Sequence, residues 1–99
     1  MNALLYLPQQ LPQTIESDGL SVQAGFAQVL ERVAVLLDCT PELVDVLASG
    51  PGYVAYSIFD SEGEVNLSAM VAVTEISGVA FEAEDEDAVL RGTVLIVRG

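Results

Sequence analysis

Acidic side chains gather in two short segments whose spacing raises the question of metal binding. Asp60, Glu62 and Glu64 alternate along the first segment. The second carries five acids in six positions: Glu82, Glu84, Asp85, Glu86 and Asp87. Carboxylate oxygens are the ligands that Ca²⁺ and Mg²⁺ prefer. The spacing does not fit an EF-hand loop, because Gly63 stands at the fourth position and that loop needs glycine at the sixth. We therefore expect no metal site and interpret both segments as solvated hairpin tips.

Nucleophilic and general acid–base chemistry lack their usual side chains. The chain contains no histidine and no lysine, which removes Ser-His and Cys-His mechanisms. Its single cysteine, Cys39, adjoins Asp38 and has no neighbouring cation in the sequence to stabilise a thiolate. Gly50-Pro51-Gly52 has neither the spacing nor the lysine of a phosphate-binding P-loop. We interpret Cys39 as a packing residue and predict a protein that is not an enzyme and needs no cofactor.

Net charge narrows the range of partners. Fifteen Asp and Glu against three arginines, Arg32, Arg91 and Arg98, give a formal charge of -12 over 99 residues. Binding to nucleic acid requires several Lys or Arg contacts to phosphate, and anionic membranes attract basic segments. The charge therefore excludes direct nucleic-acid binding and argues against membrane binding, which leaves a protein partner.

Length and composition favour one folded domain, residues 1–99. The hydrophobic fraction is 52%, too high for intrinsic disorder. No apolar run approaches the roughly 20 residues of a membrane-spanning helix, and residues 1–7 lack the basic start and the cleavage pattern of a signal peptide. One cysteine fits a reducing compartment. The expected location is the cytoplasm of the producing or host cell, or a particle assembled there.

The first half of the chain is predicted to hold two helices. Apolar residues recur at helical spacing over residues 22–37. Thr40, Pro41 and Glu42 then resemble a helix start, with a capping hydroxyl, a proline in the first turn and an acid behind it. The second helix is expected to reach residue 48. Residues 1–15, which hold two prolines and no charged side chain, are expected to be an edge strand or an extended arm.

The second half has the alternation of strands. Residues 65–74 alternate in the manner of a half-buried strand, and residues 53–59, 79–83 and 89–97 supply three more. The predicted fold class is α+β, with two N-terminal helices packed on one face of an antiparallel four- to five-strand β-meander. The core is expected to contain Phe26, Leu30, Val33, Leu37, Leu43, Leu47, Val65, Leu67, Val71, Val73, Leu95 and Val97.

These observations favour a non-catalytic protein–protein interaction or assembly protein, a small subunit of a homomeric or viral-type assembly with an acidic rim. The partner is then another copy of the chain or a basic protein. The alternative is an acidic, DNA-mimicking inhibitor of a nucleic-acid-binding protein, of the anti-restriction or anti-CRISPR type. A small acid-dependent enzyme is the least favoured reading. Contacts with a basic partner are expected at Asp60, Glu62, Glu64, Glu82, Glu84, Asp85, Glu86 and Asp87.

Overall fold

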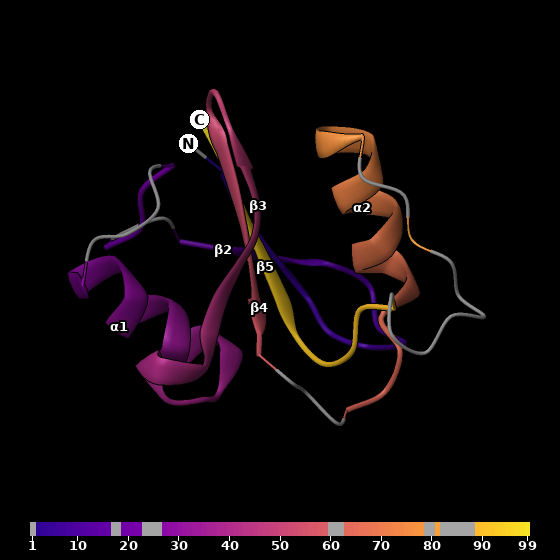
Figure 1. Cartoon of the computed structure of the whole chain (residues 1–99), viewed down its shortest axis with the longest axis horizontal. Helices are drawn as coiled ribbons and strands as arrows, with labels where there is room; N and C mark the ends of the chain where they lie inside the picture. Colours follow the sequence, from indigo (N-terminus) through magenta and orange to yellow (C-terminus); the bar gives the residue numbers. More distant parts are fainter. Residues whose placement is uncertain (1, 17–18, 23–26, 60–62, 79–80, 82–88) are drawn as a thin grey trace.

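A five-stranded antiparallel sheet lies between two helices in the computed structural model of the chain (Figure 1). The structure describes residues 2–16, 19–22, 27–59, 63–78, 81 and 89–99. In chain order its elements are β1 (Asn2–Tyr6), β2 (Gln13–Ile15), α1 (Ala27–Leu37), the 3₁₀ turn η1 (Pro41–Leu43), β3 (Val44–Gly50), β4 (Tyr53–Ile58), α2 (Leu67–Ser77) and β5 (Val94–Arg98). No helix in these ranges is long and apolar enough to cross a membrane.

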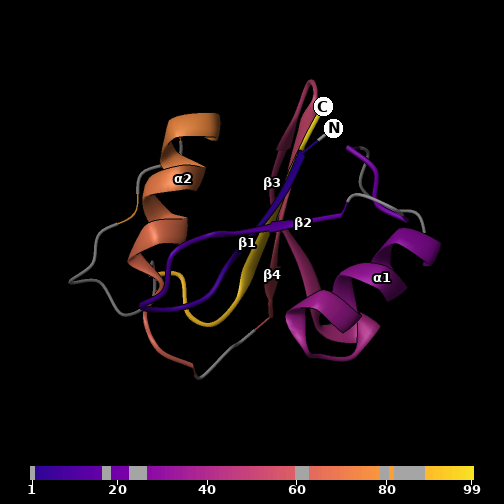
Figure 2. The same cartoon turned by 180° about the vertical axis from the view of Figure 1, so that it is seen from behind.

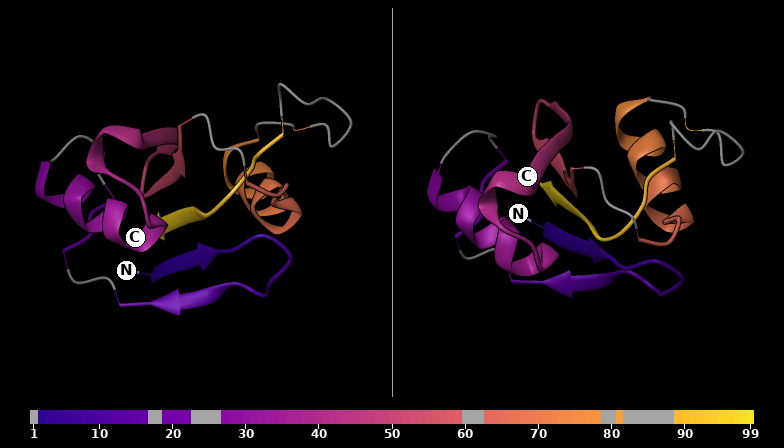
Figure 3. Two further views of the ribbon diagram at one scale, coloured as in Figure 1. Left: turned by 90° about the horizontal axis from the view of Figure 1, so that it is seen from below. Right: turned by 60° about the horizontal axis from the view of Figure 1, so that its bottom comes forward.

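The strands follow the order β2-β1-β5-β4-β3 across the sheet. The first and last strands are neighbours, with Asn2 opposite Arg98 and Tyr6 opposite Val94, so both chain ends lie at the same end of the sheet (Figure 2). Strand β1 also forms a hairpin with β2, seen at the lower edge of Figure 3. The N-terminal segment thus belongs to the domain's own sheet, with residues 13–15 at its edge.

Each helix covers a different face of this sheet. The α1 core joins the helix to one face and is formed by Ala3, Leu5, Leu20, Val29, Val33, Leu37, Val54, Tyr56, Leu95 and Val97. The α2 core lies on the other face and is formed by Tyr6, Ala55, Ala69, Met70, Val73, Leu90, Val94 and Ile96. Figure 1 shows the sheet almost edge-on between the two helices. The molecule is therefore layered helix, sheet, helix.

The predicted fold class was wrong in its arrangement. The helices are neither both N-terminal nor on one face, since the chain begins with two strands and α2 lies between β4 and β5. The physical reason is visible in β5, where four consecutive apolar residues, 94–97, are all buried. Side chains of a strand alternate between its faces, so a continuous apolar strand requires cover on both.

The predicted second helix is a strand. Thr40, Pro41 and Glu42 introduce only the short turn η1, and the Thr40 side chain makes no capping hydrogen bond. Residues 44–50 then pair with β4, where Val44 lies opposite Ile58 and the register shifts by a bulge after Val46. Cross-strand pairing in the β3–β4 hairpin outweighs the local helix-start signal.

The longest predicted strand is a helix. Residues 65–74 alternate only formally, because Met70 and Ala72, on the nominally polar side, are themselves apolar. The buried residues of α2 are Ala69, Met70 and Val73, which is helical spacing. Of the other predicted strands, residues 53–59 correspond to β4, and 89–97 to the shorter β5. The strand predicted at 79–83 and the turn at 60–63 fall mostly outside the described residues.

Three predicted core residues lie at the surface. Leu43 is 40% exposed, Leu67 58% and Val71 59%. Phe26 lies outside the described residues. The remaining predictions are buried or partly buried in one of the two cores. The error at Leu67 and Val71 follows from predicting a strand where the structure has α2. In the helix, these two large apolar side chains are in contact with solvent.

Candidate partner-binding surface on helix α2

The acidic residues predicted to bind a partner are mostly outside the described ranges. Glu64 is described and exposed, three residues before α2 begins. The other seven, Asp60, Glu62, Glu82, Glu84, Asp85, Glu86 and Asp87, are not described. In the described part of the chain no three His, Cys, Asp or Glu side chains are grouped so that they could hold a metal ion.

Cys39 lies just after α1 and is only partly exposed, packed against the α1 core. Burial, and after it the neighbouring Asp38 carboxylate, raises the pKa of its thiol. A raised pKa means less thiolate at neutral pH and a weaker nucleophile. Cys39 thus has the character of a packing residue.

Helix α2 is fixed in place by Asn66, which is completely buried. Its side-chain oxygen accepts a hydrogen bond from the Ala69 amide at 3.1 Å and so caps the helix. Its side-chain nitrogen donates to the carbonyls of Tyr6, at 2.9 Å, and Gly92, at 2.8 Å. One amide thereby joins the start of α2 to the end of β1 and to the segment leading into β5.

The far end of α2 is closed by Gly78. This glycine has a φ of 77° and its amide donates to the Thr74 carbonyl. Glycine adopts that left-handed conformation without a side-chain clash, which makes it the usual residue after a helix. Both ends of α2 are therefore defined, and the orientation of its faces follows from the burial of Ala69, Met70 and Val73 against the sheet.

The outer surface of α2 carries two exposed aliphatic side chains along the first half of the helix. Leu67 and Val71 are one helical turn apart and more than half exposed. The helix contains one charged residue, Glu75, which is exposed a turn beyond Val71. Residues at i and i+4 are neighbours on a helix, so the two aliphatic side chains form one continuous patch.

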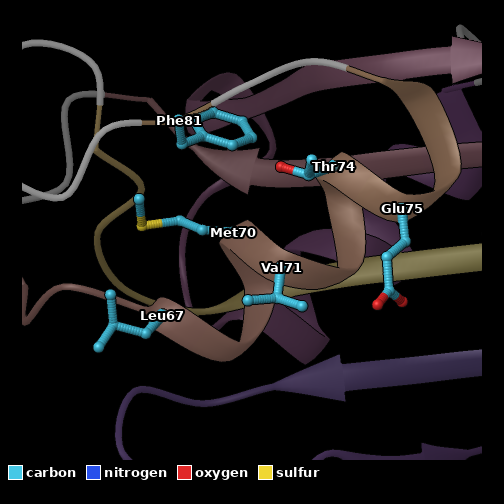
Figure 4. A pocket seen from close by; sticks show the side chains of 6 residues that line it. All are labelled: Leu67, Met70, Val71, Thr74, Glu75 and Phe81. Carbon is cyan, nitrogen blue, oxygen red and sulfur yellow. The ribbon is translucent and has the colours of Figure 1, made fainter.

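A hollow of about 460 Å³ adjoins this patch, and we call it the α2 groove. It is lined by Leu67, Met70, Val71, Thr74, Glu75 and Phe81. In Figure 4 the Phe81 ring lies beside Met70 and Thr74, while Leu67 and Val71 lie along the outer side of the helix. Apolar walls with few polar groups are typical of sites that take apolar side chains from a ligand or partner.

A second, smaller hollow of about 300 Å³ lies on the other flank of α2, between the helix and strands β1 and β5. Its apolar lining is formed by Leu4, Ala72, Ile76 and Ile96, and its polar lining by Tyr6, Glu75 and Arg98. Burial raises the pKa of Tyr6; the Arg98 guanidinium lowers it and the Glu75 carboxylate raises it, with a net increase. Glu75 lines both hollows, so the polar flank and the apolar groove adjoin each other across one helix.

The sequence offered one overlooked signal for this surface. Over residues 65–74 there is no charged side chain, and Leu67 and Val71 also fit a period of four. A segment that fits both helix and strand spacing is apolar on more than one side, so as a helix it has apolar residues beyond the face that packs on the sheet. The sequence did not predict Met70 and Phe81 as site residues. For Phe81, no pattern in the neighbouring sequence indicates that it lies beside the helix.

Comparison with known proteins gives no assignment: no protein-family model, curated protein or solved structure matches the chain. The α2 groove must be interpreted on its own geometry.

Proposed function

We propose that the protein acts by binding another protein, without catalysing a reaction, and that the α2 groove is the contact surface. The observation that carries this proposal is the pair Leu67 and Val71, 58% and 59% exposed beside an apolar hollow. Single exposed aliphatic residues are common on soluble proteins, whereas two adjacent ones beside an apolar hollow offer a place where apolar side chains of a partner can pack. The fold itself gains nothing from leaving these side chains in water.

The absence of catalysis is supported by the side chains near the groove. Its lining offers one carboxylate, Glu75, and one hydroxyl, Thr74. The chain has no histidine to activate either group. Cys39 lies on the opposite side of the sheet, with the α1 core. A groove with this lining can hold apolar side chains but has little chemistry to offer them.

The test is a selection of displayed peptides on the purified protein, followed by binding measurements on three variants of the bait. The double variant Leu67→Gln/Val71→Gln removes the patch and keeps good helix formers. The matched control is Val35→Gln, because Val35 is 70% exposed on the outer side of α1. We expect selected peptides to lose about tenfold or more in affinity for the double variant, as for truncated hot spots, and to bind the control like the natural chain.

Equal binding to all three proteins would contradict the proposal. Peptides that bind the natural chain, the double variant and the Val35 variant with the same affinity would show that the α2 groove is not the contact surface. Circular dichroism of the double variant provides the folding control, since both substituted side chains are exposed and contribute little to stability.

A further inference from the structure

The charge of the chain narrows what the α2 groove binds. Acids outnumber arginines fifteen to three, giving -12 overall. Two of the three arginines adjoin α2 and already face neighbouring polar groups: Arg91 donates to the Gly63 carbonyl at 3.3 Å, and Arg98 shares the second hollow with Glu75. A second copy of the chain would bring a further -12, and like charge disfavours association. A positively charged partner is favoured over a copy.

The acid that the structure places at the groove is Glu75, and sequence order adds further acids close by in the chain. Phe81, which lines the groove, is followed in the chain by Glu82 and, after Ala83, by the four consecutive acids of residues 84–87. Opposite charges around an apolar contact raise the rate of encounter and select among partners more than they add affinity. The apolar groove would then supply most of the binding free energy, and the acids would select for a basic sequence.

The spacing along α2 indicates the shape of the occupant. Leu67, Val71 and Thr74 recur at intervals of four and three residues, so they form a ridge along the helix. A second helix with the same spacing packs its own ridge beside such a row. An amphipathic helix laid into an apolar groove is an established mode of peptide recognition, anchored at positions i, i+3, i+4 and i+7.

We infer that the α2 groove binds a cationic amphipathic helix belonging to another protein. The apolar face of that helix packs on Leu67 and Val71 and fills the space beside Phe81. Its Lys and Arg side chains face Glu75 at the groove and the net negative charge of the chain. This inference rests on the proposed function and adds the chemistry of the partner to it.

The experiment compares three synthetic peptides of about 18 residues, long enough to form a helix. The first places leucine at i, i+3, i+4 and i+7 with lysine elsewhere; the second replaces its lysines by glutamate; the third replaces its leucines by serine. Fluorescence anisotropy measures each against the natural chain, Leu67→Gln/Val71→Gln and Val35→Gln. Measurements in about 0.05 M and about 0.5 M sodium chloride vary the screening of exposed charges.

We expect the leucine–lysine peptide to bind the natural chain and the Val35 variant about tenfold or more tightly than the double variant. Its affinity should fall with salt, and each of the other two peptides should bind at least about tenfold more weakly. Equal binding of the glutamate peptide would overturn the inference while the proposed function stands. Equal binding of the leucine–lysine peptide to all three proteins would overturn both.

A second copy as occupant has its own signature. Sedimentation of the natural chain alone is expected to give a monomer. A dimer that Leu67→Gln/Val71→Gln abolishes and Val35→Gln leaves intact would overturn the cationic partner and assign the groove to self-association, with the groove still a protein contact.

Discussion

The two helices cover opposite faces of one sheet, yet they differ in what they present to solvent. On α1 the exposed aliphatic residue is Val35, set between Glu31 and Asp38, which are both exposed. On α2 the exposed residues Leu67 and Val71 adjoin each other and an apolar hollow. Both helices bury an apolar side against the sheet. Of the two helices, α2 has two exposed aliphatic side chains next to each other, beside the exposed polar residues Ser68, Thr74 and Glu75.

The difference separates residues needed for the fold from residues available for function. A helix that covers a sheet needs one apolar stripe and a polar outer side, and α1 approximates that pattern. The outer side of α2 departs from it at a cost in solubility, with no gain in packing. Exposed apolar side chains on the outer side of a helix are best explained by a contact with a partner after folding. We therefore place the partner on α2 rather than on α1.

The largest expected effect tests how firmly α2 is held. Asn66→Ala removes the helix cap and leaves the carbonyls of Tyr6 and Gly92 without their donor. Unpaired buried polar groups cost about 1 to 3 kcal/mol each, so we expect a loss of roughly 3 to 5 kcal/mol in the free energy of unfolding. Urea denaturation followed by circular dichroism measures it.

Two further variants make this test specific. Asn66→Asp keeps an acceptor for the Ala69 amide, but an ionised carboxylate cannot donate to the two carbonyls, so most of the loss should remain. Thr40→Ala is the control before η1, where the side chain makes no capping bond, and it should change stability by less than about 0.5 kcal/mol. A loss below about 1 kcal/mol for Asn66→Ala would mean that other contacts position α2.

The second largest expected effect on stability is the difference between truncating buried and exposed valines. Val33 on α1 and Val73 on α2 are at most 1% exposed, whereas Val71 is 59% exposed. Removing two buried methyl groups costs about 2 kcal/mol with the cavity included, so Val33→Ala and Val73→Ala should lose that much stability. Val71→Ala should lose less than about 0.5 kcal/mol. If the Val71 variant were as unstable as the Val73 variant, this part of α2 would be core rather than contact surface.

How far the sequence predicts this fold depends on whether a segment's pattern fits one structure or two. The helical period of residues 22–37 is unambiguous, and α1 lies within that range, at 27–37. The strands predicted at 53–59 and 89–97 are short, mostly apolar runs, and they correspond to β4 and the shorter β5. Residues 44–50 follow a good helix start, and only pairing with β4 makes them a strand. Pairing with a neighbouring strand decides this case, and the pattern of residues 40–50 alone does not show it.

The candidate site was missed in the sequence for a related reason. The acids at Asp60, Glu62 and Glu82 drew attention because they are charged and clustered. The groove is formed by residues that looked like core, Leu67 and Val71, together with Phe81, which lines the same hollow from beyond the end of the helix. Once residues 67–77 are known to be helical, the period of four that exposes Leu67 and Val71 follows at once.

The smallest expected effect compares two tyrosines on opposite faces of the sheet. Tyr56 belongs to the α1 core, and its buried hydroxyl makes no hydrogen bond within the described residues. Tyr6 belongs to the α2 core and lines the second hollow. An unpaired buried hydroxyl is unfavourable, so Tyr56→Phe should raise the free energy of unfolding by about 1 kcal/mol. Tyr6→Phe should change it by less than about 0.5 kcal/mol, because a hydroxyl at a hollow can meet water.

The two tyrosines also govern stability in alkali. Burial raises the pKa of both phenols above the ordinary value of 10.0. A raised pKa in the folded state means that stability is constant below pH 10 and falls as the pH rises from there through the folded pKa, because the unfolded chain loses its proton first. Removing Tyr56 or Tyr6 should therefore flatten the decline measured by urea denaturation above pH 10. If the free energy of unfolding fell as steeply above pH 10 in Tyr56→Phe as in the natural chain, the Tyr56 hydroxyl would be hydrated. Water would then reach the α1 core, contrary to the difference expected between the two tyrosines.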